Sequence, residues 1–167
     1  MSTFSTSILV EAPLRTVYNQ WTQFESFPLF MDGVDEVRQV DDRTLDWTAS
    51  IGGQTKTWSA RITRQLPDRA IAWESVAGAR NAGTVTFERV SDSVTRVTLE
   101  LDVEPEGPIE SAGNALGFVR RRVEGDLERF KTFMEDRGTE TGAWRGVLAP
   151  EAEDSLQAAR KPVRAGR

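Results

Sequence analysis

The residues that could do chemistry in this chain are of few types. Its 167 residues include no cysteine and no histidine, which excludes thiolate nucleophiles, Ser-His-Asp triads, zinc sites built from Cys and His, and a histidine acid or base. Carboxylates, lysines, arginines, hydroxyls and the single tyrosine, Tyr18, remain. The sequence also has no Gly-rich phosphate loop and no G-x-S-x-G motif. It therefore predicts neither a cofactor nor a metal site, and it identifies no catalytic residue.

Lys56 is the first candidate for a polar contact with a ligand. The pair Gly52-Gly53 is typical of a two-residue hairpin loop, which fixes the register of the strands on either side. The predicted partners are Ile51 with Gln54, Ala49 with Lys56, Trp47 with Trp58, and Leu45 with Ala60. One face of the hairpin therefore carries two tryptophans and a lysine. Lys56 could contact a ligand there, or extend its stem to water at the end of the hairpin.

Arg120 is the second candidate, at the edge of a long apolar helix face. Apolar side chains recur over residues 109–134 with a period of 3.6, which predicts an amphipathic helix. At 100° per residue, Arg120 lies about 60° from the centre of the apolar face, whereas Arg121 and Arg122 are predicted to point away. Arg120 could border a cavity beneath the helix, or pair with Glu124 in solvent.

Strands and two short helical segments precede this helix. Alternating residues 4–10 predict a first strand, Pro13 opens a short amphipathic helix that reaches Trp21, and residues 24–31 predict a second short helix or turn. Six further strands, separated by turn signals, follow as an antiparallel meander. They are predicted over residues 34–40, 44–51, 54–64, 70–76, 83–90 and 95–103. The element order indicates an α+β fold.

Charge and hydropathy limit the partners and the location. The chain has 21 Lys and Arg against 26 Asp and Glu, a net charge of −5, which argues against binding to nucleic acid. The first residues lack the basic and apolar regions of a signal peptide, and no run approaches 18 apolar residues. We expect a cytoplasmic protein with no transmembrane segment, as a monomer or a homodimer.

One domain is expected over residues 1–137, with a tail over residues 138–167. The chain length fits one ordinary domain. The apolar period of the long helix lapses after Gly138, so the tail is predicted to be a mobile appendage. Alternatively, Trp144, Leu148 and Leu156 could form one face of a weak helix.

Several short motifs resemble those of a known family. They are Ile8-Leu-Val-Glu-Ala-Pro13 before Tyr18 and Trp21, Phe27-Pro-Leu-Phe-Met31, Leu66-Pro67-Asp68 before Trp73, Asn81-Ala-Gly83, and Leu127-Glu-Arg-Phe130. With these motifs, residues 3–136 resemble the START-related (helix-grip) superfamily, and specifically its polyketide cyclase/dehydrase and coenzyme-Q-binding-like branch. The resemblance implies a curved antiparallel sheet of about seven strands, in the order β-α-α-β6-α, around the long C-terminal helix. It also implies an apolar cavity between the sheet and that helix.

This cavity is the predicted ligand site. The residues expected to bind the ligand are Phe30, Met31, Trp47, Lys56, Trp58, Trp73, Phe87, Leu116, Val119 and Arg120. The alternative is that the aromatic side chains fill a dry core, because a filled core and a lined pocket have the same sequence pattern.

Two functions fit such a cavity. The first is the binding or carriage of a hydrophobic small molecule, such as a quinone, a lipid or a polyketide-like aromatic compound. The second is a polyketide cyclase, aromatase or dehydrase, for which the resemblance implies an Arg and a Tyr or similar hydroxyl in the pocket. Tyr18 lies on the first helix and no interior acid/base pair is evident, so binding is the preferred hypothesis. A third possibility is a structural or partner-binding role with a filled core.

Overall fold

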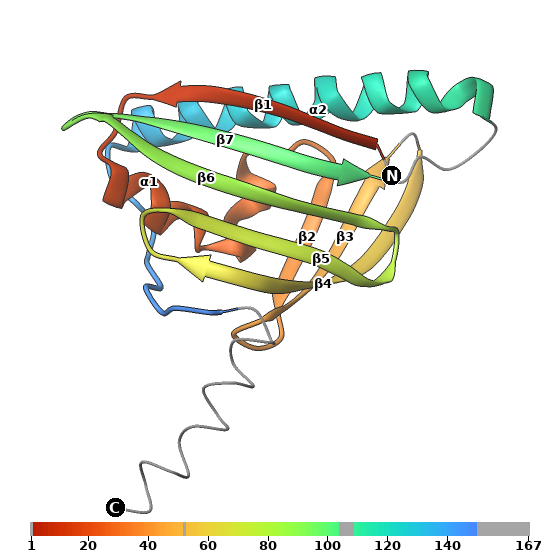
Figure 1. The fold of residues 1–167 in the computed structure, drawn as a ribbon, viewed down its shortest axis with the longest axis horizontal. Coiled ribbons are helices and arrows are strands. Elements are labelled where there is room, and N and C mark those ends of the chain that lie inside the picture. The colour runs from red at the N-terminus through yellow and green to blue at the C-terminus, as the bar shows by residue number, and fades with distance from the viewer. Residues whose placement is uncertain (1, 52, 104–108, 150–167) are drawn as a thin grey trace, which may run out of the picture.

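Seven strands form one antiparallel sheet that curls against a long C-terminal helix (Figure 1). The computed structural model describes residues 2–51, 53–103 and 109–149, with side chains for all of them except residues 2, 51 and 109–116. The strands are β1 (Ser2–Val10), β2 (Val34–Gln39), β3 (Thr44–Ile51), β4 (Gln54–Leu66), β5 (Ala70–Gly78), β6 (Asn81–Ser91) and β7 (Val94–Val103). The helices are α1 (Leu14–Trp21), the 3-10 helix η1 (Phe24–Leu29) and α2 (Ile109–Arg137). The sheet order is β1-β7-β6-β5-β4-β3-β2, and the predicted α+β fold is confirmed.

The register predicted for the β3–β4 hairpin is confirmed. The partners are Ile51 with Gln54, Ala49 with Lys56, Trp47 with Trp58, and Leu45 with Ala60. Gly53 in the loop has a φ of +79°, a left-handed conformation that glycine adopts without steric cost. A local turn signal therefore decides which face of the sheet receives the two tryptophans.

β4 bends the sheet and leaves part of its own edge open. Its pairing with β5 shifts register twice, once between Ser59 and Ala60 and again between Ile62 and Arg64, and such bulges bend a strand. On its other side, β4 pairs with β3 only as far as Arg61. The last residues of β4 therefore extend beyond β3 and can accept another partner there.

α2 presents one apolar face to the rest of the domain. Leu127, Phe130 and Met134 recur at three- and four-residue spacing and are all buried. The helix ends where Gly138 takes a φ of +74° and its N–H donates to the Met134 carbonyl at 2.8 Å. No helix in the described part of the chain combines the length and the hydropathy that crossing a bilayer requires.

Aromatic side chains fill one end of the space between the sheet and α2. Trp21 and Phe30 both pack edge-on against Phe130, with ring centroids 4.9 and 5.2 Å apart respectively. Phe27 joins this group through Trp21, at 5.7 Å. Edge-to-face contacts of this kind are favourable geometries for aromatic rings. This end of the domain is a packed core, and a cavity adjoins it beside residues 118–127 of α2.

Residues 138–149, which we call the C-terminal strap, lie against α1 and β4 (Figure 1). Leu148 is buried and exchanges two backbone hydrogen bonds with Gln65, of 2.8 and 2.9 Å, on the open edge of β4. Apart from this single bridge, the strap has no regular secondary structure. The mobile appendage or weak helix predicted from residue 138 is therefore corrected for the strap. Residues 150–167, including Leu156, lie outside the described part of the chain.

Polar side chains of α1 and of its C-cap residue hold the strap in place. Gln20 exchanges hydrogen bonds with Thr141, from its Nε2 at 3.1 Å and to its Oε1 at 2.8 Å. Asn19 donates to the Glu140 carboxylate at 2.9 Å, and Thr22 Oγ1 accepts the Trp144 N–H at 3.0 Å. Asn19 and Gln20 of α1, and Thr22 at the C-cap of that helix, are almost fully buried. Hydropathy could not reveal this contact, because the matching surfaces are polar.

Candidate functional site

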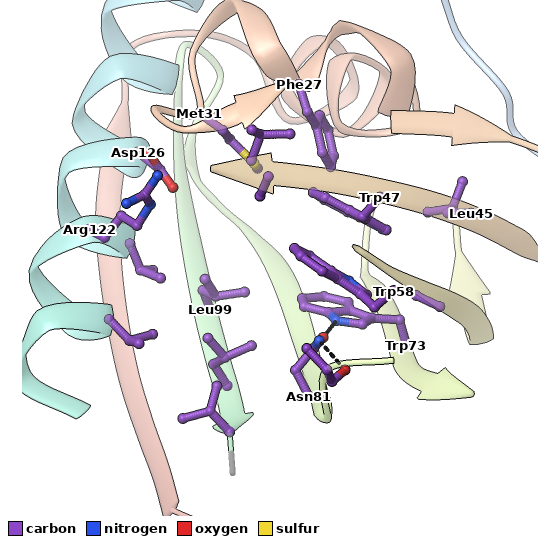
Figure 2. A pocket seen from close by; sticks show the side chains of 18 of the residues that line it. Phe27, Met31, Leu45, Trp47, Trp58, Trp73, Asn81, Leu99, Arg122 and Asp126 are labelled. Atoms are coloured by element: carbon purple, nitrogen blue, oxygen red, sulfur yellow. Dashed lines mark hydrogen bonds between the residues drawn. The ribbon is translucent and has the colours of Figure 1, made fainter. Parts of the chain in front are cut away.

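A cavity of about 480 Å³ lies between the concave face of the sheet and α2 (Figure 2). Sites for small molecules are typically about 300–1,000 Å³, with mostly apolar walls. Aromatic and aliphatic side chains from α1, η1, the strands and α2 make up most of this wall. The polar exceptions are Lys56, Arg80, Asn81, Arg122 and Asp126.

Three tryptophans form one wall of the cavity. Trp47 of β3 and Trp58 of β4 lie nearly parallel, with ring centroids 5.5 Å apart and 11° between the ring planes. Trp73 of β5 lies beside them, and its Nε1 donates to Asn81 Oδ1 at 3.3 Å (Figure 2). The three rings were predicted to border one cavity, and the structure places them there. Contact with a ligand stays a prediction.

Gly83 allows the Trp73 ring to lie close over β6. The two residues pair directly across β5 and β6. A Cβ atom at position 83 would lie 2.6 Å from Trp73 Cζ2 and 2.9 Å from the Glu100 carbonyl oxygen, too close for either to stay in place. The glycine of the Asn81-Ala-Gly83 motif therefore shapes the tryptophan wall.

We expect Gly83→Ala to displace the Trp73 ring and to lower the free energy of unfolding by about 1–3 kcal/mol, the usual cost of overpacking. Chemical denaturation followed by tryptophan fluorescence would measure this change. Gly117→Ala is the control, since a Cβ atom there has no neighbour closer than Arg121 Nη1 at 3.7 Å. An alanine inside a helix should leave stability unchanged or raise it by up to about 1 kcal/mol. A Gly83→Ala protein as stable as the parent would contradict this account.

Arg122 and Asp126 give the cavity its charged edge on α2. Arg122 Nη2 donates to the carbonyl oxygens of Asp32, at 2.6 Å, and Ser50, at 3.3 Å. Asp126 Oδ1 accepts the Asp32 N–H at 3.0 Å and a bond from Arg129 Nη2. These side chains join α2 to the loop before β2 and to the end of β3. Both functional groups border the cavity (Figure 2).

Asp126 is a carboxyl group in an unusual environment. Burial raises the pKa of Asp126 above its ordinary value, and the hydrogen bonds from Arg129 and the Asp32 N–H oppose that shift without cancelling it. A carboxyl group with a raised pKa beside a guanidinium group can exchange a proton more readily near neutral pH than an ordinary aspartate. No three carboxylates among the described residues lie close enough to bind a metal ion.

The predicted roles of Arg120 and Arg122 are corrected. Arg120 donates from Nη2 to the Ser5 carbonyl at 3.3 Å and lies over the Phe4 ring, so it packs on β1 and does not border the cavity. Arg122, predicted to point away, lines the cavity instead. The helix rule locates the apolar face, but the sheet wraps around α2. One flank of that face therefore meets β1 and the other meets the cavity.

Two predicted aromatic residues belong to the packed core. Phe30 contacts Phe27, Phe130 and Phe133, and Phe87 contacts Tyr18 and Trp21. Neither ring lines the cavity. The expectation that they line the cavity is corrected. For Phe87, alternation along a strand gives the face of a side chain and not its depth along that face. Phe30 follows η1, a short helix in which no periodic pattern shows which rings pack into the core.

Met31, Lys56 and Val119, in contrast, line the cavity as expected. The side chain of Leu116 lies outside the described residues. Arg80, Asn81, Phe118 and Asp126 also line it, and none was predicted to do so. The spacing of residues 119, 122, 123, 126 and 127 would have indicated this helix face. A turn such as that of Arg80 gives no comparable signal.

A curled seven-stranded sheet closed by a C-terminal helix is the helix-grip fold of the START superfamily. The chain is similar to the Zhui aromatase/cyclase from Streptomyces sp. R1128, with a TM-score of 0.72 and 17% identity, covering 86% of this chain and 99% of that one. It is also similar to a START superfamily protein from Mycobacterium smegmatis, with a TM-score of 0.63 and 16% identity, covering 75% and 94% of the two chains. At sequence identities this low, the structural similarity establishes the fold alone.

The chain belongs to the polyketide cyclase/dehydrase and lipid transport family, whose model matches residues 10–132. A relative from Streptomyces lincolnensis, an uncharacterized 17.2 kDa protein in the melC2-rnhH intergenic region, is 50% identical over 149 residues. The match covers 89% of this chain and 99% of the relative. The predicted family is confirmed. Family and fold together support hydrophobic-ligand binding or polyketide cyclisation, without specifying which.

Proposed function

We propose that this protein binds a flat hydrophobic small molecule in the cavity and carries it without chemical change. A quinone, a lipid with a ring system or a polyketide-like aromatic compound would fit this description. The observation that carries the proposal is a cavity of about 480 Å³ with the stacked indoles of Trp47 and Trp58 in its wall. Aromatic faces offer a large apolar area and favourable ring contacts to a flat ligand. The few polar groups can then orient the ligand.

Titration of tryptophan fluorescence with a naphthoquinone, a fatty acid and an aromatic polyketide tests the proposal. We expect saturable quenching by at least one probe. Trp47→Leu should weaken that binding by about tenfold, because it removes one ring of the stacked pair. Trp144→Leu is the matched control, because this tryptophan lies in the C-terminal strap and not in the cavity wall. Failure of every probe to bind, or equal affinities for Trp47→Leu and the parent, would count against the proposed site.

A second candidate function, cyclisation of a polyketide-like substrate, is favoured by the presence of both Arg122 and Asp126 in the cavity wall. A guanidinium group can polarise a ketone, and a carboxyl group with a raised pKa can transfer a proton during ring closure. Incubation with a reactive poly-β-ketone, followed by chromatography, separates the two functions. A carrier leaves the product pattern of the buffer reaction unchanged. A cyclase changes it, and Asp126→Asn should then abolish the change while ligand binding persists.

A further inference from the structure

The charged side chains of the cavity wall are mostly of one sign. Lys56 on β4, Arg80 between β5 and β6, and Arg122 on α2 are basic, and Asp126 is the single acid. The Asp126 carboxylate is already engaged by Arg129 and by a backbone N–H. The chain as a whole has a net charge of −5. The cavity wall is therefore mainly basic, whereas the chain as a whole is acidic.

The three cations stand on elements that meet at one end of the cavity. Arg122 Nη2 donates to the Ser50 carbonyl at 3.3 Å, and Ser50 is next along β3 to the residue that pairs with Lys56. Arg80 lies in the turn after β5, a strand whose pairing with β4 ends two residues from Lys56. The opposite end of the cavity borders the buried aromatic core. The cavity thus has an apolar end and a basic end.

Arg122 can bind a further acceptor without losing its present contacts. Both of its backbone hydrogen bonds use Nη2. Its Nη1 and Nε make no hydrogen bond with any residue that the structure describes. A guanidinium group has five N–H donors in a planar fork that fits a carboxylate or a phosphate. The ring of Phe118, which is 43% exposed, lies 5.9 Å from the Arg122 guanidinium and extends the apolar wall beside it.

We infer that the ligand is an amphiphilic anion, whose hydrophobic body enters the cavity first and whose carboxylate or phosphate remains between Lys56, Arg80 and Arg122. This inference rests on the proposed function and narrows its ligand class. An apolar body fills the end beside the aromatic core and lies along the tryptophan wall, and charge-assisted hydrogen bonds hold the anionic group at the basic end. A neutral ligand of the same shape gains the first contribution and not the second.

Matched naphthalene probes test the inference by isothermal titration calorimetry. They are 2-naphthoate, 2-naphthyl phosphate and the neutral ester methyl 2-naphthoate. We expect one or both anions to bind the parent protein at least about tenfold more tightly than the ester. The anion that binds more tightly shows whether the site prefers a carboxylate or a phosphate. Arg122→Gln and Lys56→Gln should each reduce this preference while leaving the affinity for the ester unchanged. Arg121→Gln, at an exposed neighbour outside the cavity wall, is the control and should keep the full preference.

The possible outcomes distinguish the proposed hydrophobic site from its preference for an anionic ligand. Equal binding of ester and anions overturns the inference and leaves the proposed hydrophobic site standing. A preference that is unchanged in both Arg122→Gln and Lys56→Gln overturns the assignment of the basic end. Absence of binding by all three probes overturns the proposed function and the inference with it.

Discussion

A chain that ends at Gly138 should unfold about 10 °C below a chain that ends at Ala149. The shorter chain lacks residues 139–149 of the C-terminal strap, and with them the burial of Leu148 and its two backbone hydrogen bonds with Gln65. Burying a leucine is worth about 1.5–3 kcal/mol, and each intramolecular hydrogen bond about 1 kcal/mol. The hydrogen bonds of the strap with Asn19, Gln20 and Thr22 add to these terms, and the entropy of ordering the strap offsets most of the total. We expect a net loss of about 3 kcal/mol, which corresponds to the stated fall in melting temperature. Differential scanning calorimetry of the two chains measures it.

Two point variants keep this prediction testable if the shorter chain folds poorly. Leu148→Ala in the full chain should cost about 2–3 kcal/mol, in the lower part of the range for buried leucines. Gln20→Ala should destabilise the chain that ends at Ala149 more than the chain that ends at Gly138, because Gln20 bonds with Thr141 only when the strap is present. Equal melting temperatures for the two chain lengths, with no coupling to Gln20, would show that the strap does not stabilise the domain.

Local signals in the sequence located the elements of the fold, and the family resemblance supplied their arrangement. The Gly52-Gly53 loop set the β3–β4 register, and the change of period after Val103 located α2. Each of these signals lies within the segment whose structure it predicts. The long-range pairing of β1 with β7 was not predicted, because alternation identifies a strand without identifying its partner.

The strap and the basic end of the cavity were not predictable in the same way. The strap binds through polar side chains of α1, such as Gln20, which sequence patterns assign to solvent. Arg122 reaches the cavity because the sheet encloses one flank of α2, a fact of tertiary structure that the helical wheel does not contain. Arg120, closer to the centre of the apolar face, meets β1 instead.

Core and cavity aromatics also look alike in the sequence, and only their surroundings separate them. Phe130 is fully buried and contacts rings on two sides, from Trp21 and from Phe30. Trp47 stacks on Trp58 with one part of its surface and borders the cavity with another. Truncation to alanine should therefore cost more stability at Phe130 and more ligand affinity at Trp47.

Phe130→Ala should lower the free energy of unfolding by about 3–5 kcal/mol, the range for large aromatic residues in packed cores. Trp47→Ala should cost less, about 2 kcal/mol, because the side chain already lacks neighbours on its cavity side and loses fewer contacts. Urea denaturation at equilibrium gives both values. A larger loss for Trp47→Ala than for Phe130→Ala would mean that the space beside Trp47 is closed in solution and that the tryptophans form part of the core.

Binding should rank the same two variants in reverse. A ligand that binds only the folded protein raises its melting temperature by an amount set by the ratio of ligand concentration to Kd. With a saturating ligand, Phe130→Ala should gain nearly the parent's increase in melting temperature, because its lost ring lies outside the cavity wall. Trp47→Ala should gain several degrees less, since it lacks half of the stacked pair. Equal increases in melting temperature would place the ligand away from Trp47 and Trp58. A smaller increase for Trp47→Ala, although it is the more stable variant, would locate the ligand against their rings.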